Sequence, residues 1–130
     1  MEEVLTIPLD MISRNFSLKE MECKCGCGIR NIDGHAIDTL QNLRDTVGRP
    51  LYITSAARCV DHNLDVGGSA ISFHISTVDH KSKAFDISMR GHHIDSFVKM
   101  AQKVGFTGIG IYRTFVHVDT RPGKARWNYA

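Results

Sequence analysis

The segment GIGIYRTFVHVDT, residues 108–120, contains two runs of β-forming residues joined around Arg113. Such runs on either side of a short polar connection predict two strands and a tight turn. Because side chains alternate along a strand, His117 and Asp119 project to one face, and the valines beside them project to the other. Valine belongs in a core, so this pattern places the polar pair on an open face of a sheet.

Five further elements are predicted from hydrophobic periodicity and from helix start and stop signals. They are a short helix beginning at the capping box SLKE (17–20), a helix from Asp33 that ends at Gly48, strands over 51–57 and 84–89, and a helix over 94–104 that ends at Gly105. Helices come first, followed by a sheet that carries one helix. This order predicts the α+β class, with a small antiparallel sheet and flanking helices.

The strand over 84–89 contains AFDIS, in which alternation sets Asp86 opposite its apolar neighbours. Two adjacent antiparallel strands then present Asp86 and His117 side by side, and a histidine of the preceding loop completes a trio. Two imidazoles and one carboxylate with an open fourth position are typical of catalytic zinc, which supports amide hydrolysis. Taken as spacing alone, a histidine on a strand is also common as an ordinary surface residue.

Length and composition narrow the class of protein. With 130 residues, the chain is expected to form one domain, 1–130, and a monomer. The formal charge of +2, without a basic run, argues against a nucleic-acid partner. No apolar run approaches the ~20 residues needed to cross a bilayer. The acidic start lacks the apolar region of a signal peptide, so synthesis in the cytoplasm without secretion is expected.

Four cysteines stand at positions 23, 25, 27 and 59. A disulfide framework fits poorly with the expected absence of a signal peptide. A zinc knuckle is an alternative, although the alternating spacing differs from the usual C-x₂-C clamp. The remaining interpretation is small buried side chains with free thiols. We expect a structural role and leave its chemistry open.

Four segments together carry a family resemblance. They are FSLKEMECKCGCG, LYITSAARCVDHNLDVGGSAISFH, KAFDIS and GIGIYRTFVHVDTRPGKARW, which span about residues 15–127. They resemble the zinc D-alanyl-D-alanine peptidases, peptidase M15, and more narrowly the small peptidoglycan-peptidase branch common in bacteriophages. The resemblance implies the small α+β fold shared with the hedgehog signalling domain, with zinc on the antiparallel sheet.

The resemblance implies that zinc is held by His74, Asp86 and His117. In the family a Val-Gly-Gly stretch leads to Ser-x-His, which falls here at His74. Family members usually place the aspartate seven positions after that histidine, whereas here it follows after twelve, as a five-residue insertion near STVDH would give. Loops accept such insertions at low entropic cost. His80, six positions before Asp86, is the rival ligand.

The resemblance also assigns substrate contacts. Arg58 matches the arginine that recognises a substrate carboxylate or polarised carbonyl, and Ser72 matches a serine that contacts the substrate backbone. The alternatives are a surface salt bridge for Arg58 and a turn hydroxyl for Ser72. No carboxylate precedes the last histidine where other branches place the general base. Asp119 is the remaining candidate, either as that base or as a residue that orients His117.

The implied function is a zinc-dependent peptidase that cleaves bacterial peptidoglycan, as a D,D-carboxypeptidase or as a cross-link or stem endopeptidase. Its partners would be stem peptides or muropeptides. A phage lysis enzyme or virion component that reaches the cell wall after release is expected. The alternative is a non-catalytic wall-binding or structural domain that kept the fold.

Overall fold

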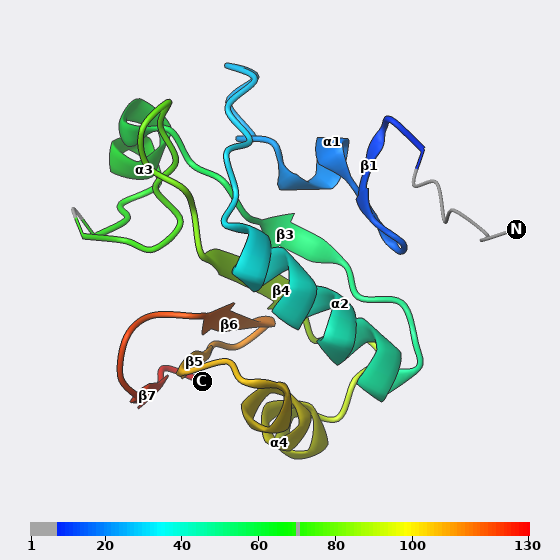
Figure 1. Ribbon diagram of the computed structural model, residues 1–130. Helices are drawn as coiled ribbons and strands as arrows, with labels where there is room; N and C mark the ends of the chain where they lie inside the picture. The colour runs from blue at the N-terminus through cyan, green and yellow to red at the C-terminus, as the bar shows by residue number, and fades with distance from the viewer. Residues whose placement is uncertain (1–7, 70) are drawn as a thin grey trace, which may run out of the picture.

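The computed structural model describes residues 8–69 and 71–130 (Figure 1). The acidic start of the chain, on which the signal-peptide prediction depends, lies largely outside these residues. Within them, no helix combines the length and the apolar character needed to span a membrane.

A five-stranded sheet forms the centre of the fold, with strand order β3-β4-β6-β5-β7. Its strands are β3 (Ile53–Ser55), β4 (Ala84–Ser88), β5 (Gly108–Ile111), β6 (Phe115–Asp119) and β7 (Ala125–Asn128). Neighbouring strands are antiparallel except β5 and β7, which are parallel. Strands β4, β5 and β6 lie where the sequence predicts them, and β3 is shorter than predicted. The α+β class is confirmed.

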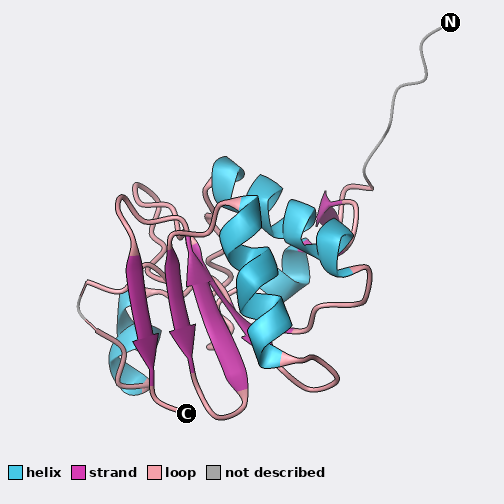
Figure 2. Cartoon of the chain, turned by 90° about the horizontal axis from the view of Figure 1, so that it is seen from below, coloured by secondary structure: helices cyan, strands magenta, loops and turns pink. Residues whose placement is uncertain are grey.

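Two long helices cover one face of this sheet (Figure 2). Helix α2 (Gly34–Val47) begins at Asp33, whose side chain accepts from the backbone N–H of Ala36, and ends at Gly48 with φ of 72°. Glycine adopts this left-handed conformation without steric cost. Helix α4 (Ile94–Val104) ends at Gly105 in the same way. Both helices were predicted with these ends.

The hydrophobic core lies between the helices and the sheet. Strands β4 and β6 contribute residues that alternate with the polar ones predicted to face the other way. The buried side chains include Phe85, Ile87, Val116 and Val118 from the sheet, Leu40 and Leu43 from α2, and Phe97 and Ala101 from α4. Each large apolar side chain that is fully buried stabilises the fold by about 1.5–3 kcal/mol.

The N-terminal part of the described chain packs at the β3 edge. Strands β1 (Met11–Ser13) and β2 (Phe16–Ser17) form a short antiparallel hairpin, and helix α1 (Leu18–Met21) follows. Both hydrogen bonds of the predicted capping box are present, because Ser17 Oγ accepts from Glu20 N and a Glu20 carboxylate oxygen accepts from Ser17 N. Phe16 and Met21 are buried and join this segment to the core.

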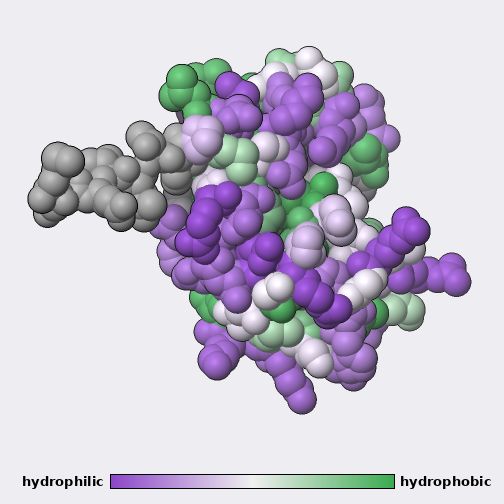
Figure 3. Space-filling view, turned by 90° about the vertical axis from the view of Figure 1, so that its right-hand side faces the viewer, coloured by the Kyte–Doolittle hydropathy of each residue, from purple (hydrophilic) through white to green (hydrophobic). Residues whose placement is uncertain are grey.

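Four elements have no counterpart in the sequence prediction: strands β1 and β2 of the hairpin, strand β7 and helix α3 (Val60–Asp65). Helix α3 lies beyond the end of β3, away from α2 and α4 (Figure 1). The face of the molecule in Figure 3 carries mainly hydrophilic side chains, with apolar atoms in small patches, as expected for a surface in contact with water.

Candidate metal centre and the cleft around it

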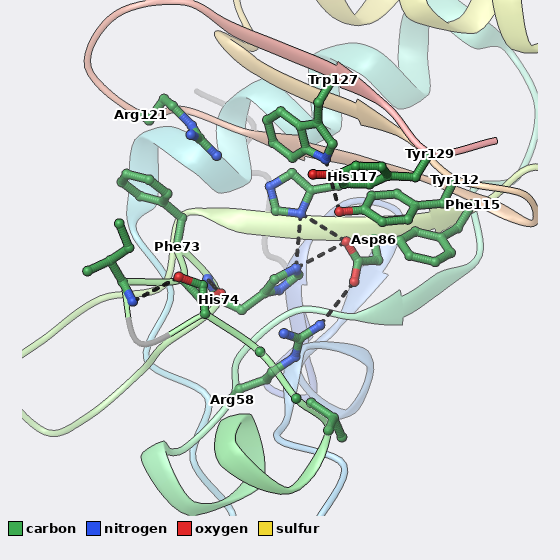
Figure 4. A pocket seen from close by; sticks show the side chains of 16 residues that line it. Arg58, Phe73, His74, Asp86, Tyr112, Phe115, His117, Arg121, Trp127 and Tyr129 are labelled. Atoms are coloured by element: carbon green, nitrogen blue, oxygen red, sulfur yellow. Dashed lines mark hydrogen bonds and ion pairs between the residues drawn. The ribbon is translucent and has the colours of Figure 1, made fainter.

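Strands β4 and β6 place an aspartate and a histidine side by side. Asp86 is the direct cross-strand partner of His117. Directly paired residues have their Cβ atoms about 4.5–5.5 Å apart. The neighbours of both residues in sequence point into the core, so the predicted alternation is confirmed. Both polar side chains point into a cleft on the other face of the sheet (Figure 4).

His74 reaches this pair from the loop before β4. Its backbone C=O accepts from the N–H of Arg58 at 2.8 Å, and its ring Nδ1 lies 2.7 Å from the C=O of Ala56. A carbonyl oxygen only accepts, so Nδ1 carries the proton and Nε2 keeps its lone pair. The segment after β3 therefore fixes both the position and the tautomer of His74.

Three acceptor atoms converge at the floor of the cleft. His74 Nε2, Asp86 Oδ1 and His117 Nδ1 lie 3.0, 3.0 and 3.2 Å from one another, and all three residues are buried. Ligand atoms that surround zinc tetrahedrally at about 2.0–2.1 Å lie about 3.3 Å apart. Lone pairs facing one another in a buried site repel unless a proton or a cation lies between them. The donor set and its spacing fit zinc.

The pKa values of the three residues show which of them carries charge in this buried site. Burial lowers the pKa of His74, so the ring tends to be neutral. Burial also opposes a charge on His117, but hydrogen bonds to Asp119 and Asp86 raise its pKa above the ordinary value. Burial disfavours the charge on Asp86 as well, yet hydrogen bonds with His117 and His74 hold its pKa well below the usual carboxyl range. Asp86 is therefore an anion that attracts a proton or a metal ion.

Asp119 lies behind His117 on the predicted face of the sheet but is fully buried, so the prediction that this face is open at Asp119 is wrong. Its Oδ2 accepts from His117 Nε2 at 2.7 Å and from Arg121 Nη2 at 2.6 Å, and its Oδ1 accepts from Arg121 Nε at 2.8 Å. Burial disfavours its charge, but hydrogen bonds from Arg121 and His117 hold its pKa well below the usual range. Because the N–H of His117 Nε2 donates to Asp119, the lone pair of Nδ1 points toward His74 and Asp86.

Arg58 borders the trio on the Asp86 side. Its Nη2 lies 3.2 Å from Asp86 Oδ2, while its Nε donates to Ser55 Oγ at 3.1 Å. The guanidinium thus holds the carboxylate oxygen that does not face the histidines. Arg58 lines the cleft and is largely buried, so it is not the surface salt bridge considered as an alternative.

The cleft has a volume of about 590 Å³ and an aromatic wall across from Arg58 (Figure 4). The wall consists of Tyr112, Phe115, Trp127 and Tyr129, and Phe73 lines the cleft separately, next to His74. Ser72 also lines the cleft, and its Oγ accepts from the N–H of His74 at 3.1 Å. The hydroxyl therefore has a turn role even though it borders the space where a substrate would lie.

The lengthened loop before β4 folds onto itself beside the site. Thr77 N donates to the C=O of His80, and His80 N donates to Thr77 Oγ1, which closes a turn over residues 77–80. His80 is exposed and lies outside the trio, whereas His74 is 2 % exposed within it. This is the arrangement expected if the extra residues form a surface turn.

Two glycines of β5 allow close packing behind the trio. Gly110 pairs with His117, and Gly108 pairs with Asp119. A Cβ on Gly110 would lie 2.2 Å from the ring of Trp127, and one on Gly108 would lie 2.1 Å from Asp119 Oδ1. Both contacts are too short for any side chain, so GIG in the sequence reflects the approach of these groups.

Two side chains of this site have no assigned role in the sequence analysis. Arg121 pairs with Asp119 and stacks between Phe73 and Trp127, with its guanidinium carbon 4.5 and 5.0 Å from their ring centroids. Trp127 also lies 5.3 Å from the His117 ring and donates to the Tyr112 hydroxyl at 2.9 Å. The only sequence signal for Arg121 was its position two residues after Asp119, just past the end of a strand.

The family model described as Peptidase M15 matches residues 14–119, most of the chain and all three residues of the trio. No curated protein matches the chain.

Proposed function

The chain belongs to the peptidase M15 family, and we propose that it is a zinc-dependent peptidase that hydrolyses peptide bonds of bacterial peptidoglycan. One observation carries the proposal: three buried lone pairs from two histidines and an aspartate converge at the floor of an open cleft. Two histidines and one carboxylate that leave a further position free are the donor set of catalytic rather than structural zinc.

His74, Asp86 and His117 would hold the metal through Nε2, Oδ1 and Nδ1. A zinc ion held there would polarise the scissile carbonyl and lower the pKa of a water molecule to about 7.

Arg58 supplies fixed positive charge next to the reacting carbonyl. Its guanidinium is held by Asp86 and Ser55, so it is already oriented when negative charge develops on the carbonyl oxygen. A preorganised donor of this kind typically contributes about 10²–10³ in rate. The same group would attract the terminal carboxylate of a stem peptide if the enzyme removes a single residue.

Asp119 acts through His117 in this proposal. The carboxylate does not line the cleft, and both of its oxygens accept hydrogen bonds from His117 or Arg121. A positioning role therefore fits its contacts better than that of a general base. It holds the tautomer of His117 and makes Nδ1 more basic toward the metal.

The aromatic wall would bind the peptide across from Arg58. Trp127 and Tyr112 are joined by a hydrogen bond, and Tyr112 stacks on Phe115 with ring centroids 4.4 Å apart. Such a rigid apolar surface packs against aliphatic parts of a substrate at little cost in side-chain entropy. The resemblance of the sequence to a peptidase branch common in bacteriophages favours a role in lysis or in the virion, with the cell wall as the site of action.

Release of new amino groups from purified sacculi tests the proposal. The untreated protein should release amines, a chelator should stop the release, and added zinc should restore it. His74→Ala should be inactive and His80→Ala active. Mass spectrometry of products from defined muropeptides would then show which bond is cut. Binding to sacculi without amine release by the zinc-loaded protein would contradict the proposal and support the non-catalytic alternative.

A further inference from the structure

A second cluster of possible metal ligands lies outside the cleft. The Sγ atoms of Cys23, Cys25, Cys27 and Cys59 all lie within 4.8 Å of one another. Three of these cysteines follow helix α1, and the fourth caps helix α3, which comes more than thirty residues later in the sequence. The fold thus gathers every cysteine of the chain at one point.

The sulfur spacing is that of a tetrahedral metal site. Cys23 Sγ lies 3.4 Å from Cys25 Sγ and 3.8 Å from Cys59 Sγ, and the last two sulfurs are 3.7 Å apart. Four sulfurs at about 2.3 Å from a central zinc ion would be separated by about 3.8 Å. Disulfides would instead bring the sulfurs together in pairs at about 2.05 Å. No such pair has formed, since all four cysteines are free.

The backbone around the first three cysteines is shaped to bring alternate residues to one point. Gly26 and Gly28 adopt φ of 87° and 85°, where other residues would be strained. Cys23 N donates to the C=O of Ile29 at 2.7 Å, which closes the loop. An extended CxCxC segment would direct its cysteines to one side in a line, whereas this loop folds them around a centre.

Backbone N–H groups also point at the sulfurs. Cys59 N donates to Cys23 Sγ at 3.4 Å, and His62 N donates to Cys59 Sγ at 3.3 Å. Such hydrogen bonds stabilise thiolates and orient them as ligands. The two contacts orient Cys23 and Cys59 and would stabilise both as thiolates once a cation is bound.

We infer that Cys23, Cys25, Cys27 and Cys59 form a structural zinc site, separate from the His74–Asp86–His117 trio. Four soft thiolates select zinc over magnesium or calcium. Four protein ligands leave no open position, as in structural sites elsewhere. Each thiol releases its proton to solvent when it ligates, so binding is favoured by rising pH.

The zinc site would link the loop after α1 to the segment between β3 and α3, which carries Arg58. Cys59 follows Arg58 directly, and Ala57 N donates to the C=O of Met21 at 3.1 Å on the other side. Apart from these hydrogen bonds, the loop with the three cysteines is largely exposed and has little apolar burial of its own. A metal clip at Cys59 therefore restrains the segment that positions Arg58 beside Asp86.

The test uses a protein from which the other metal site has been removed. The variant His74→Ala/His117→Ala, purified under reducing conditions, should still hold about one zinc per chain. Replacement of zinc by Co²⁺ should give a thiolate-to-cobalt charge-transfer band and the strong visible bands of a tetrahedral site. Adding Cys27→Ser should abolish both the bands and the bound zinc. Lys24→Ala, at an exposed position between two of the cysteines, is the matched control and should change neither.

If the variants fail to fold, the Co²⁺ spectrum can be recorded on the unaltered protein. Only the cysteine site gives a thiolate band, so the histidines of the other site do not interfere. Absence of this band from the folded, reduced protein would overturn the inference. The inference would also be overturned if protein purified without reductant contained no metal and had a mass two hydrogens lower for each disulfide than the fully reduced chain. Neither result depends on peptidase activity, so failure of the proposed function would leave this test intact.

Discussion

Replacing Asp119 by asparagine separates the two roles that the sequence left open for this residue. In the structure Asp119 Oδ2 accepts from His117 Nε2 and from Arg121, and Oδ1 accepts from Arg121. An amide has one oxygen and one NH₂ group, so in either orientation one buried donor of His117 or Arg121 faces another donor. His117 Nε2 then either loses its acceptor or keeps only a neutral amide oxygen in place of a carboxylate, so its tautomer should be held more weakly.

The loss expected for such a partner of a metal-ligating histidine is about 10–100-fold in zinc affinity. This corresponds to about 1.4–2.8 kcal/mol, at 1.4 kcal/mol for each factor of ten. The zinc affinity of the trio is measured at neutral pH by competition with a chromophoric chelator. The signal of this site is identified as the one that is missing in His74→Ala. Asp79→Asn, an exposed carboxylate in the turn over 77–80, is the control and should bind zinc as before.

The reasoning would be refuted if Asp119→Asn kept its zinc affinity but lost amine release by a hundredfold or more. Asp119 would then act on the substrate or on water as the general base, and not through His117. A loss of activity restored by excess zinc would instead support the positioning role.

Three further predictions follow from the site. Arg58→Met should lower kcat on muropeptides by about 10²–10³-fold while the zinc content stays unchanged, and full activity would contradict its role beside the carbonyl. Gly108→Ala places a Cβ 2.1 Å from Asp119 Oδ1, so urea unfolding should show a loss of about 1–3 kcal/mol, whereas Gly34→Ala, with no atom within 4 Å, should show none. Zinc affinity at the trio should fall as the pH drops from about 8 to about 5, because protons compete for the histidines. Since the pKa of His117 is raised, this competition should begin above the pH at which an ordinary histidine titrates. A chelator titration in which the zinc affinity rises as the pH falls would contradict the prediction.

Much of the fold could be predicted because the relevant signals are local. The alternation in AFDIS and FVHVD fixes which side chains enter the core, and the structure pairs Asp86 with His117 as that pattern predicts. The ends of α2 and α4 follow from Asp33, Gly48 and Gly105. Helix α3 and strand β7 could not be predicted in this way. Helix α3 has only six residues and no apolar periodicity, and β7 pairs in parallel with β5, so no hairpin turn marks it in the sequence.

Burial within the site depended on contacts between distant segments. Alternation gave the correct face for Asp119 but not its burial, because Arg121 and the close approach at Gly108 cover it. The cysteine spacing differs from the usual C-x₂-C clamp, so the sequence does not predict that the four sulfur atoms meet at one point. The left-handed glycines that bend the loop of the first three cysteines, and the arrival of Cys59 from another segment, are features of the three-dimensional fold.

The most direct test of the account is the zinc content of the purified protein and of His74→Ala and His80→Ala, measured together with amine release from sacculi. The account predicts that His74→Ala loses one equivalent of zinc per chain along with the activity, and that His80→Ala keeps both. Equal zinc content in His74→Ala and the unaltered protein, or a loss of zinc and activity in His80→Ala alone, would contradict it.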